Sequence, residues 1–187
     1  MPGNVDRRVR RTRDAIHRAF IGLMQEKGYD AVTVTDIIER ADVGRSTFYA
    51  HFTDKRDVLY ASLDDLAAFL RRHRDGELFG FSRALFDHVH EQRPLLRTLL
   101  GRQGGSVVQA RVAVLIGDLV REQLQDRPTD VPRELIVDCV VGAYTSLLAR
   151  WVDENDPHTP AQMDAAFRRL LAPGVTAALG SPTSAAG

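Results

Sequence analysis

The sequence predicts an all-helical protein in which a small N-terminal three-helix unit is joined to a larger C-terminal helical bundle. Apolar residues recur three or four positions apart along most of the 187 residues, whereas the two-residue alternation typical of strands is nearly absent. Glycine, proline and helix-capping residues interrupt this pattern at intervals. The chain is 44% hydrophobic and 27% charged, as is ordinary for a globular protein. Its length allows one sizeable core or a small unit fused to a larger one.

The N-terminal third is expected to form helices with clear start and stop signals. The first carries an apolar stripe and is expected to end at Gly28, since glycine readily adopts the left-handed conformation of a helix C-terminus. Thr33 and Asp36 match the capping-box pattern T-x-x-D, which predicts a second helix through Ala41. A turn then precedes the segment GRSTFYAHF, and Asp54 is placed to cap a longer helix after it. The apolar stripes of the first and fourth helices are formed by Ile16, Phe20, Leu23 and Met24, and by Leu59, Leu63, Leu66 and Leu70.

Beyond about Arg74 the periodic segments predict a larger helical region. Pro94 is expected to interrupt one apolar stripe, and the glycine-rich segment 101–105 is expected to form a joint before the next. Apolar residues at helical spacing occupy 85–89, 108–119, 136–151 and 163–171, with breaks at 127–132 and 153–160. The expected division is an N-terminal domain over 1–66, a C-terminal domain over 67–180 and a disordered tail of small and polar residues over 181–187.

The cysteine count and the N-terminus indicate a soluble, cytoplasmic protein. Cys139 is the single cysteine, so no internal disulfide can form, which suits a reducing compartment. The expectation for Cys139 itself is a small buried thiol. The N-terminal segment MPGNVDRRVRRTRDA is charged where a signal peptide would be apolar. No apolar run is expected to reach the roughly 18 residues of a membrane helix, so no membrane is expected as a partner.

No residue pattern indicates an enzyme, a cofactor or a metal site. His88 and His90 are two positions apart, and side chains at this spacing on a helix diverge and cannot face one ion. Gly104 and Gly105 lack the lysine and serine of a phosphate-binding loop and therefore indicate a joint between helices.

The segment GRSTFYAHF predicts how the N-terminal helices are used. Phe48 and Phe52 are four positions apart and fall on one helix face, which is expected to pack in a small core. The residues that remain outside are Arg45, Ser46, Thr47, Tyr49 and His51. A short helix that follows another across a turn, with one buried and one polar face, is typical of a helix-turn-helix motif whose last helix enters the DNA major groove. Arginine and threonine suit base edges, whereas Tyr49 and His51 suit phosphates or are polar residues at the edge of the core.

The charge distribution agrees with DNA as a partner, although the net charge is zero. Five arginines crowd the N-terminus against two aspartates; they are Arg7, Arg8, Arg10, Arg11 and Arg13. Such a segment is either an arm that lies along DNA or an ordinary solvated helix end.

Residues 33–59, TVTDIIERADVGRSTFYAHFTDKRDVL, resemble the DNA-binding domain of the tetracycline repressor (TetR) family of transcriptional regulators. The features that match are the capped helix with Ile37 and Ala41, the turn at Val43, the run Thr47-Phe48-Tyr49, the pair His51-Phe52, and Lys55 at the next helix. Two departures are Gly44, where the family often has serine, and Ile38, where alanine is usual. The resemblance implies phosphate contacts from Thr33, Tyr49, His51 and Lys55, and base-edge readout from Thr35, Arg45, Ser46 and Thr47.

The resemblance also implies a C-terminal domain for ligand binding and dimerisation. In the family this domain usually holds a pocket whose closure moves the two recognition helices apart. The implied function is a homodimeric repressor that a small apolar or amphipathic ligand releases from a near-palindromic double-stranded DNA operator. The expected pocket residues, each of which is also a candidate for plain core, are Phe69, His73, Phe86, His90, Leu100, Val112, Ile116, Tyr144 and Leu148. The alternatives are a regulator whose C-terminal domain binds a protein partner, and an all-helical enzyme or structural bundle, which the missing catalytic residues disfavour.

The last two predicted helices are expected to form the dimer interface. Residues 142–167 are similar to the final helix pair of one TetR subgroup, in which these helices build the dimer. Besides a core stripe, the first of the two has a flatter line that would let another helix approach closely: Leu135, Cys139, Gly142, Ser146 and Arg150. The second adds Met163, Phe167 and Leu170. Pairing across a two-fold axis would give a four-helix bundle and hold the recognition helices about one turn of DNA apart.

Overall fold

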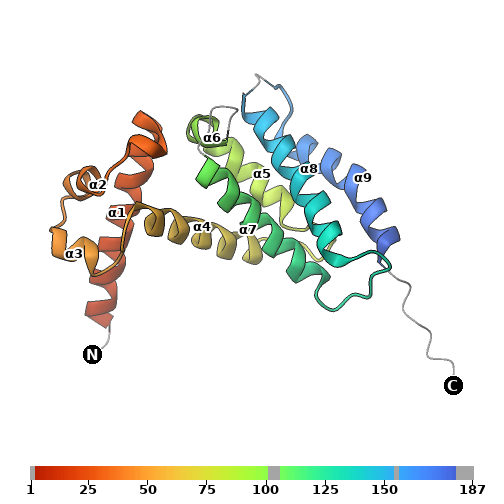
Figure 1. Ribbon diagram of the computed structural model, residues 1–187, viewed down its shortest axis with the longest axis horizontal. Coiled ribbons are helices and arrows are strands. Elements are labelled where there is room, and N and C mark those ends of the chain that lie inside the picture. The colour runs from red at the N-terminus through yellow and green to blue at the C-terminus, as the bar shows by residue number, and fades with distance from the viewer. Residues whose placement is uncertain (1–2, 101–105, 154–155, 180–187) are drawn as a thin grey trace.

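The structure, a computed structural model, describes residues 3–100, 106–153 and 156–179 (Figure 1). Within these ranges the chain forms nine helices, and its one β-type pairing is an isolated bridge between Thr129 and Leu179. The helices are α1 (Gly3–Ala31), α2 (Val34–Ala41), α3 (Arg45–Tyr49), α4 (Lys55–Arg72), α5 (Ser82–Glu91), α6 (Arg93–Leu100), α7 (Ser106–Leu124), α8 (Arg133–Asp153) and α9 (Pro160–Ala178). The prediction of an all-helical fold is confirmed.

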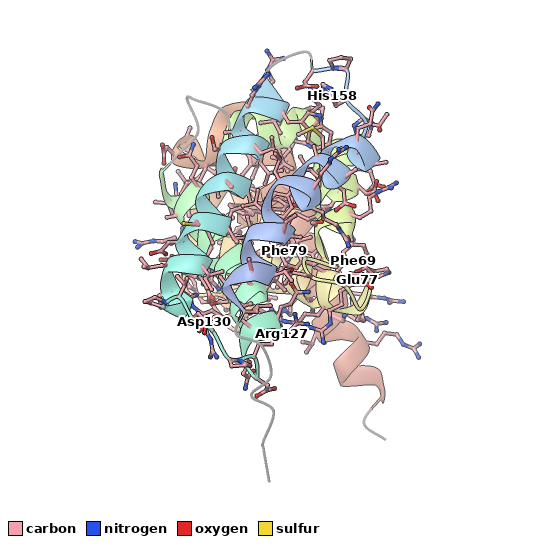
Figure 2. The ribbon with its side chains drawn as sticks, turned by 90° about the vertical axis from the view of Figure 1, so that its right-hand side faces the viewer. Phe69, Glu77, Phe79, Arg127, Asp130 and His158 are labelled. Carbon is pink, nitrogen blue, oxygen red and sulfur yellow. The ribbon has the colours of Figure 1, made fainter. Side chains whose placement is uncertain are left out.

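The helices form two parts that α4 connects (Figure 1). At one end α1, α2 and α3 lie together, with α2 packed on α1. From there α4, which also packs on α1, runs into the larger part and packs on α7. In the larger part α7 packs on α8 and α5 packs on α9, while α6 contacts both α8 and α1. Figure 2 shows α8 and α9 side by side on the face of the bundle remote from α1, α2 and α3.

The predicted helix caps are confirmed at α2 and α4. The Thr33 hydroxyl accepts a hydrogen bond from the Asp36 N–H at 3.2 Å, and the Asp36 carboxylate accepts one from the Thr33 N–H at 2.7 Å. The Asp54 carboxylate accepts a hydrogen bond from the Asp57 N–H at 2.9 Å. Each of these bonds satisfies a backbone N–H that has no partner inside its helix. Pro94 stands in the first turn of α6 and separates it from α5, as expected.

Gly28 interrupts the regular geometry of α1, as predicted, and one further helical turn follows it to Ala31. Its backbone has φ 75° and ψ 161°, a conformation that favours glycine, yet α1 continues to Ala31. The turn after the kink is held from outside by the side chain of Lys55, whose contacts are given below. A sequence pattern within α1 cannot reveal this support because it comes from 25 residues or more further along the chain.

The predicted boundary at residue 66 falls inside α4, which belongs to both parts. On its first half, the Arg111 guanidinium of α7 donates a hydrogen bond to Asp64 at 3.0 Å and lies 4.7 Å from the centre of the Tyr60 ring. Near its end, Arg71 pairs with Glu122 of α7 through two nitrogen atoms, at 2.5 and 3.0 Å. The division into 1–66 and 67–180 stays a prediction, and the predicted tail over 181–187 lies outside the described residues.

The larger part is built around α8 and a cluster of aromatic rings. Phe86 stacks on Tyr144 with ring centroids 5.0 Å apart, and Phe167 and Trp151 meet these rings edge-on. By length and composition alone, α8 could span a membrane, with a mean hydropathy of 1.5 over Arg133–Val152. The expectation that no such apolar run exists is therefore wrong. The composition of α8 has another explanation, because the helix supplies this aromatic core with its two largest side chains.

Candidate nucleic-acid interface and ligand cavity

The short helix α3 divides its side chains between a buried and an exposed face, as predicted. Phe48 is 0% exposed and Phe52, which follows the helix, is 2% exposed. Their ring centroids are 6.0 Å apart, and the Tyr49 ring meets Phe48 edge-on at 5.4 Å while remaining 51% exposed. Aromatic pairs in this geometry stabilise the packing beyond the area they bury. The two phenylalanines thus anchor α3 against the N-terminal core.

The side chains expected to meet DNA lie on the outer face of this unit. Arg45, Ser46 and Thr47 are exposed, and His51 is half-buried. An Arg45 nitrogen donates a hydrogen bond to the Thr35 hydroxyl of α2 at 3.4 Å. This contact joins two residues that were both predicted to read bases. It gives Thr35 a role that the sequence did not reveal, namely holding the Arg45 guanidinium. The DNA contacts of these residues stay predictions.

Thr33, an expected phosphate contact, is engaged in the cap of α2. Its hydroxyl donates to the Asp36 carboxylate at 2.6 Å, and Lys27 approaches the same oxygen at 2.7 Å. Hydrogen bonds from Lys27 and then from Thr33 lower the pKa of Asp36 below its usual range. The carboxylate therefore stays ionised and fixes the start of α2, which carries Thr35.

Lys55, the remaining expected phosphate contact, has a structural role in this fold. Its ammonium donates hydrogen bonds to three carbonyl oxygens at the end of α1, those of Tyr29 at 3.0 Å, Asp30 at 3.0 Å and Val32 at 2.8 Å. It also lies 4.6 Å from the centre of the Tyr29 ring. An ammonium has three N–H bonds, and all three are used here. Lys55 thus joins the start of α4 to the end of α1.

The N-terminal arginines lie along the outside of α1. Arg7, Arg8, Arg10 and Arg11 are exposed. The Arg13 guanidinium lies 4.9 Å from the centre of the Phe52 ring, so the first half of α1 runs beside the end of α3. Positive charge therefore continues from the exposed face of α3 along α1, on the same small unit.

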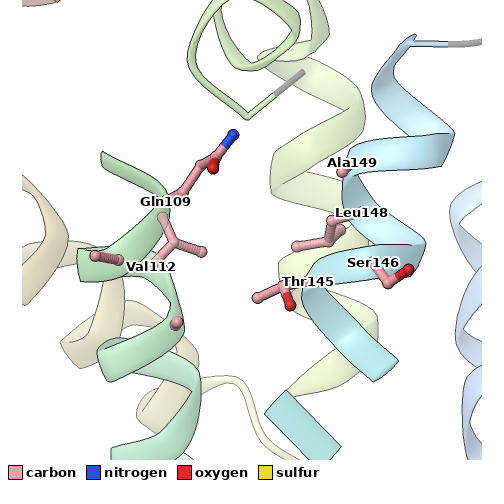
Figure 3. A pocket seen from close by; sticks show the side chains of 8 residues that line it. Gln109, Val112, Thr145, Ser146, Leu148 and Ala149 are labelled. Atoms are coloured by element: carbon pink, nitrogen blue, oxygen red, sulfur yellow. The ribbon is translucent and has the colours of Figure 1, made fainter. Parts of the chain in front are cut away.

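The larger part contains a cavity of about 470 Å³ between α7 and α8. The α7 side is lined by Gln109, Ala110, Val112 and Ala113. The α8 side is lined by Thr145, Ser146, Leu148 and Ala149. Figure 3 shows Val112 directed toward Thr145 and Leu148 across the space between the two helices, and Gln109 directed toward the upper end of that space. A volume of this size is within the range of small-molecule sites, roughly 300 to 1,000 Å³.

Two family models match the chain. The model described as "Bacterial regulatory proteins, tetR family" matches residues 16–61, which contain the helix-turn-helix. The model described as "Transcriptional regulator C-terminal region" matches residues 76–172, more than half of the chain. The chain belongs to the TetR family. TetR-family proteins are DNA-binding transcriptional regulators and not enzymes, as the sequence predicted.

Individual relatives agree with this assignment. The HTH-type transcriptional regulator YxbF of Bacillus subtilis is 36% identical over 70 residues, which cover 37% of this chain and 18% of YxbF. The HTH-type transcriptional regulator TcmR of Streptomyces glaucescens is 33% identical over 122 residues, which cover 52% of this chain and 53% of TcmR. The chain thus spans about half or less of the length of these two relatives. A crystal structure of a TetR transcriptional regulator from Streptococcus agalactiae is 26% identical with a TM-score of 0.69, covering 89% of this chain and 96% of that one.

The pocket residues expected from the TetR resemblance fall into three places. Val112 and Leu148 line the cavity between α7 and α8. Phe69, His73 and His90 line a second, more polar groove beside α4 and α5. The fully buried members of the list are Phe86, Ile116 and Tyr144, which form plain core. The side chain of Leu100 lies outside the part that the structure describes. The sequence did not predict chiefly two of the cavity residues, Gln109 and Thr145. A single polar residue inside an apolar stripe gives no sign that it faces a cavity.

The expected dimer surface of this TetR-family chain is exposed on α8 and only partly on α9. The whole flatter line of α8 is exposed; it consists of Leu135, Cys139, Gly142, Ser146 and Arg150. The expectation of a buried Cys139 thiol is therefore wrong. On α9, Leu170 is 76% exposed, but Met163 and Phe167 are 5% and 1% exposed. These two pack in the chain's own core and are removed from the expected interface, and the Phe167 ring contacts Phe86 of α5 and Tyr144 of α8.

Within 3–100, 106–153 and 156–179, no three His, Cys, Asp or Glu side chains lie close enough together to hold one ion. His88 and His90 both border the polar groove beside α5, where Arg83 and Asp87 already pair at 2.9 Å.

Proposed function

We propose that this TetR-family regulator is a cytoplasmic homodimeric repressor that a small molecule releases from a near-palindromic operator. The observation that carries the proposal is the division of α3 between two anchoring phenylalanines and an exposed polar face. Arg45 is the principal candidate for base readout, since a guanidinium can form two hydrogen bonds with guanine. The proposed role of Tyr49 is a phosphate contact, which its half-exposed side chain and its ring packed edge-on against Phe48 support.

The exposed line of α8, together with Leu170 of α9, supports the homodimer. Contiguous exposed apolar surface usually marks an interface, and the adjoining helices α8 and α9 expose Leu135 and Leu170 to 55% and 76%. Nothing lies within 4 Å of the position that a Cβ would take at Gly142, so a partner helix could approach closely there. Because a two-fold contact brings the same surface of each copy together, both leucines would be covered in a single event.

The cavity and its neighbours support release by a ligand. The cavity wall on α7 contains the turn from Gln109 to Ala113, and Arg111 within that turn holds α4 through Asp64 and Tyr60. In turn, Lys55 at the start of α4 holds the end of α1. A molecule that displaces α7 would therefore act on the orientation of the DNA-binding unit. By linkage, it must bind the DNA-free form more tightly by the factor by which it weakens operator binding.

Selection of duplexes from a random pool by the full-length protein tests the proposal. We expect a near-palindromic consensus, with a binding constant that falls steeply with salt because exposed arginines displace counterions. Arg45→Ala should relax the preference at one position in each half-site by about 1–3 kcal/mol. Arg83→Ala, which replaces another exposed arginine, on α5, is the matched control and should leave the consensus unchanged. Recovery of no consensus, or of one that Arg45→Ala leaves intact, would count against the proposal.

A further inference from the structure

The cavity between α7 and α8 differs from the other grooves in its charge. Its eight described lining residues are all uncharged, and the polar ones among them carry a hydroxyl or an amide group. The groove beside α5, in contrast, is lined by Asp75, Arg83, Asp87 and other ionisable residues. An ion that leaves water for this cavity finds no charged partner among these residues, which disfavours ions relative to uncharged molecules.

The charged residue on the α7 wall of the cavity is directed toward α4. Arg111 stands between two lining residues, Ala110 and Val112, but its guanidinium pairs with Asp64 at 3.0 Å and covers the Tyr60 ring. Reaching an anion in the cavity would require Arg111 to break both contacts with α4. The helix thus presents its small and apolar side chains to the cavity and its cation to α4.

Thr145 gives the cavity a hydrogen-bonding preference. Its hydroxyl hydrogen is directed to the backbone of its own helix, with the oxygen 2.8 Å from the Val141 carbonyl and 3.2 Å from the Gly142 carbonyl. Toward the cavity, the hydroxyl oxygen can therefore act only as an acceptor. Figure 3 shows Thr145 directed into the space between the helices and Ser146 directed away from it.

We propose that the ligand of this cavity is an uncharged, largely apolar molecule that donates a hydrogen bond to the Thr145 hydroxyl. The inference rests on the proposed function, which supplies the reason for a ligand, and adds the chemical class. Val112 and Leu148 provide the apolar walls that face each other across the cavity.

Four naphthalene probes of nearly equal size separate charge from hydrogen bonding in a calorimetric titration of the full-length protein. The probes are 2-naphthol, 2-methoxynaphthalene, 2-naphthoate and 2-naphthylmethylammonium. We expect 2-naphthol to bind at least about tenfold more tightly than either ion, since neither charge finds a partner in the cavity. It should bind roughly three- to tenfold more tightly than 2-methoxynaphthalene, which has no donor, as a single neutral hydrogen bond allows.

Two pairs of variants locate the binding. Val112→Phe fills the cavity and should abolish binding of 2-naphthol, whereas Val114→Phe, the same change two positions along α7 on an exposed side chain, should not. Thr145→Val keeps the shape of the side chain but removes the acceptor, so 2-naphthol should lose its advantage over 2-methoxynaphthalene.

Three results would overturn the inference. They are binding of either ion as tight as that of 2-naphthol, equal effects of the two phenylalanine variants, and no binding of any probe below about 1 mM. Operator binding measured on the same preparation keeps the two proposals apart. Protein that binds its operator but fails the probe test refutes this inference alone, and protein that takes the probe but binds no operator refutes the repressor proposal alone.

Discussion

Replacing Lys55 by methionine tests whether this lysine supports the fold or contacts DNA. Methionine retains the apolar stem beside the Tyr29 ring and removes the ammonium that holds the Tyr29, Asp30 and Val32 carbonyls. The bonds to Tyr29 and Val32 are partly buried, whereas the bond to Asp30 is exposed and water can replace it. Two charge-assisted bonds, at the low end of the usual 1.5–3 kcal/mol each, predict a loss of about 3 kcal/mol in the free energy of unfolding.

Guanidinium denaturation of the full-length protein measures this loss of stability. Operator binding at several salt concentrations tests the alternative, which is a contact between Lys55 and a DNA phosphate. A structural Lys55 predicts a lower denaturation midpoint and an unchanged dependence of operator binding on salt. A phosphate contact predicts the reverse, with the salt slope reduced by about one unit and little change in stability. Lys27→Met is the control, because it removes a single ion pair near the surface, with side chains 36% and 28% exposed, and such a pair should contribute less than two charge-assisted bonds. Loss of less than about 1 kcal/mol in Lys55→Met, together with a reduced salt slope, would refute the structural role.

Three further predictions concern other parts of the molecule. Thr35→Val should relax base preference at the position that Arg45 reads, but more weakly than Arg45→Ala does. The reason is that the Thr35 hydroxyl holds the Arg45 guanidinium through a hydrogen bond of 3.4 Å. An unchanged preference in duplex selection would contradict this prediction. Leu170→Arg should convert the dimer to a monomer in analytical ultracentrifugation, whereas Phe167→Ala should instead lower the free energy of unfolding by about 3–5 kcal/mol, as expected for a buried aromatic. Burial lowers the pKa of His88 from 6.5, so the unfolded chain takes up its proton at a higher pH than the folded one, and the free energy of unfolding should fall as the pH drops through 6.5. Urea titrations of His88→Gln should lack that part of the fall.

The sequence predicted best those features that depend on neighbours within one helix. The caps at Thr33 and Asp54 and the break at Pro94 each follow from a few adjacent residues, and the structure confirms them. The helical turn that follows Gly28 was not predicted, because its support comes from Lys55, which is distant in sequence.

Periodicity identified the apolar side chains but could not tell which of them the chain covers with its own residues. Phe86 and Tyr144 were expected in a pocket and Phe167 in an interface, yet all three belong to one aromatic cluster. Leu170, three positions after Phe167, is the one left outside. Buried and exposed residues of α9 fit the same helical spacing. Only the positions of α5 and α8 around α9 decide which of them are covered.

The continuity of α4 has a consequence for how the molecule melts and how it can be recombined. Its 18 residues carry Val58 and Leu59 in the N-terminal core and Ala67 and Leu70 in the C-terminal core, and all four belong to one contiguous cluster. If either part of the molecule unfolded, the other part would lose the packing that α4 provides. This dependence favours a single unfolding transition. For the same reason, a chimera that exchanges regulatory halves between family members needs both α4 and the surface of α7 that receives it from one parent. A junction inside α4 would place the first part of this helix from one parent against an α7 surface from the other parent.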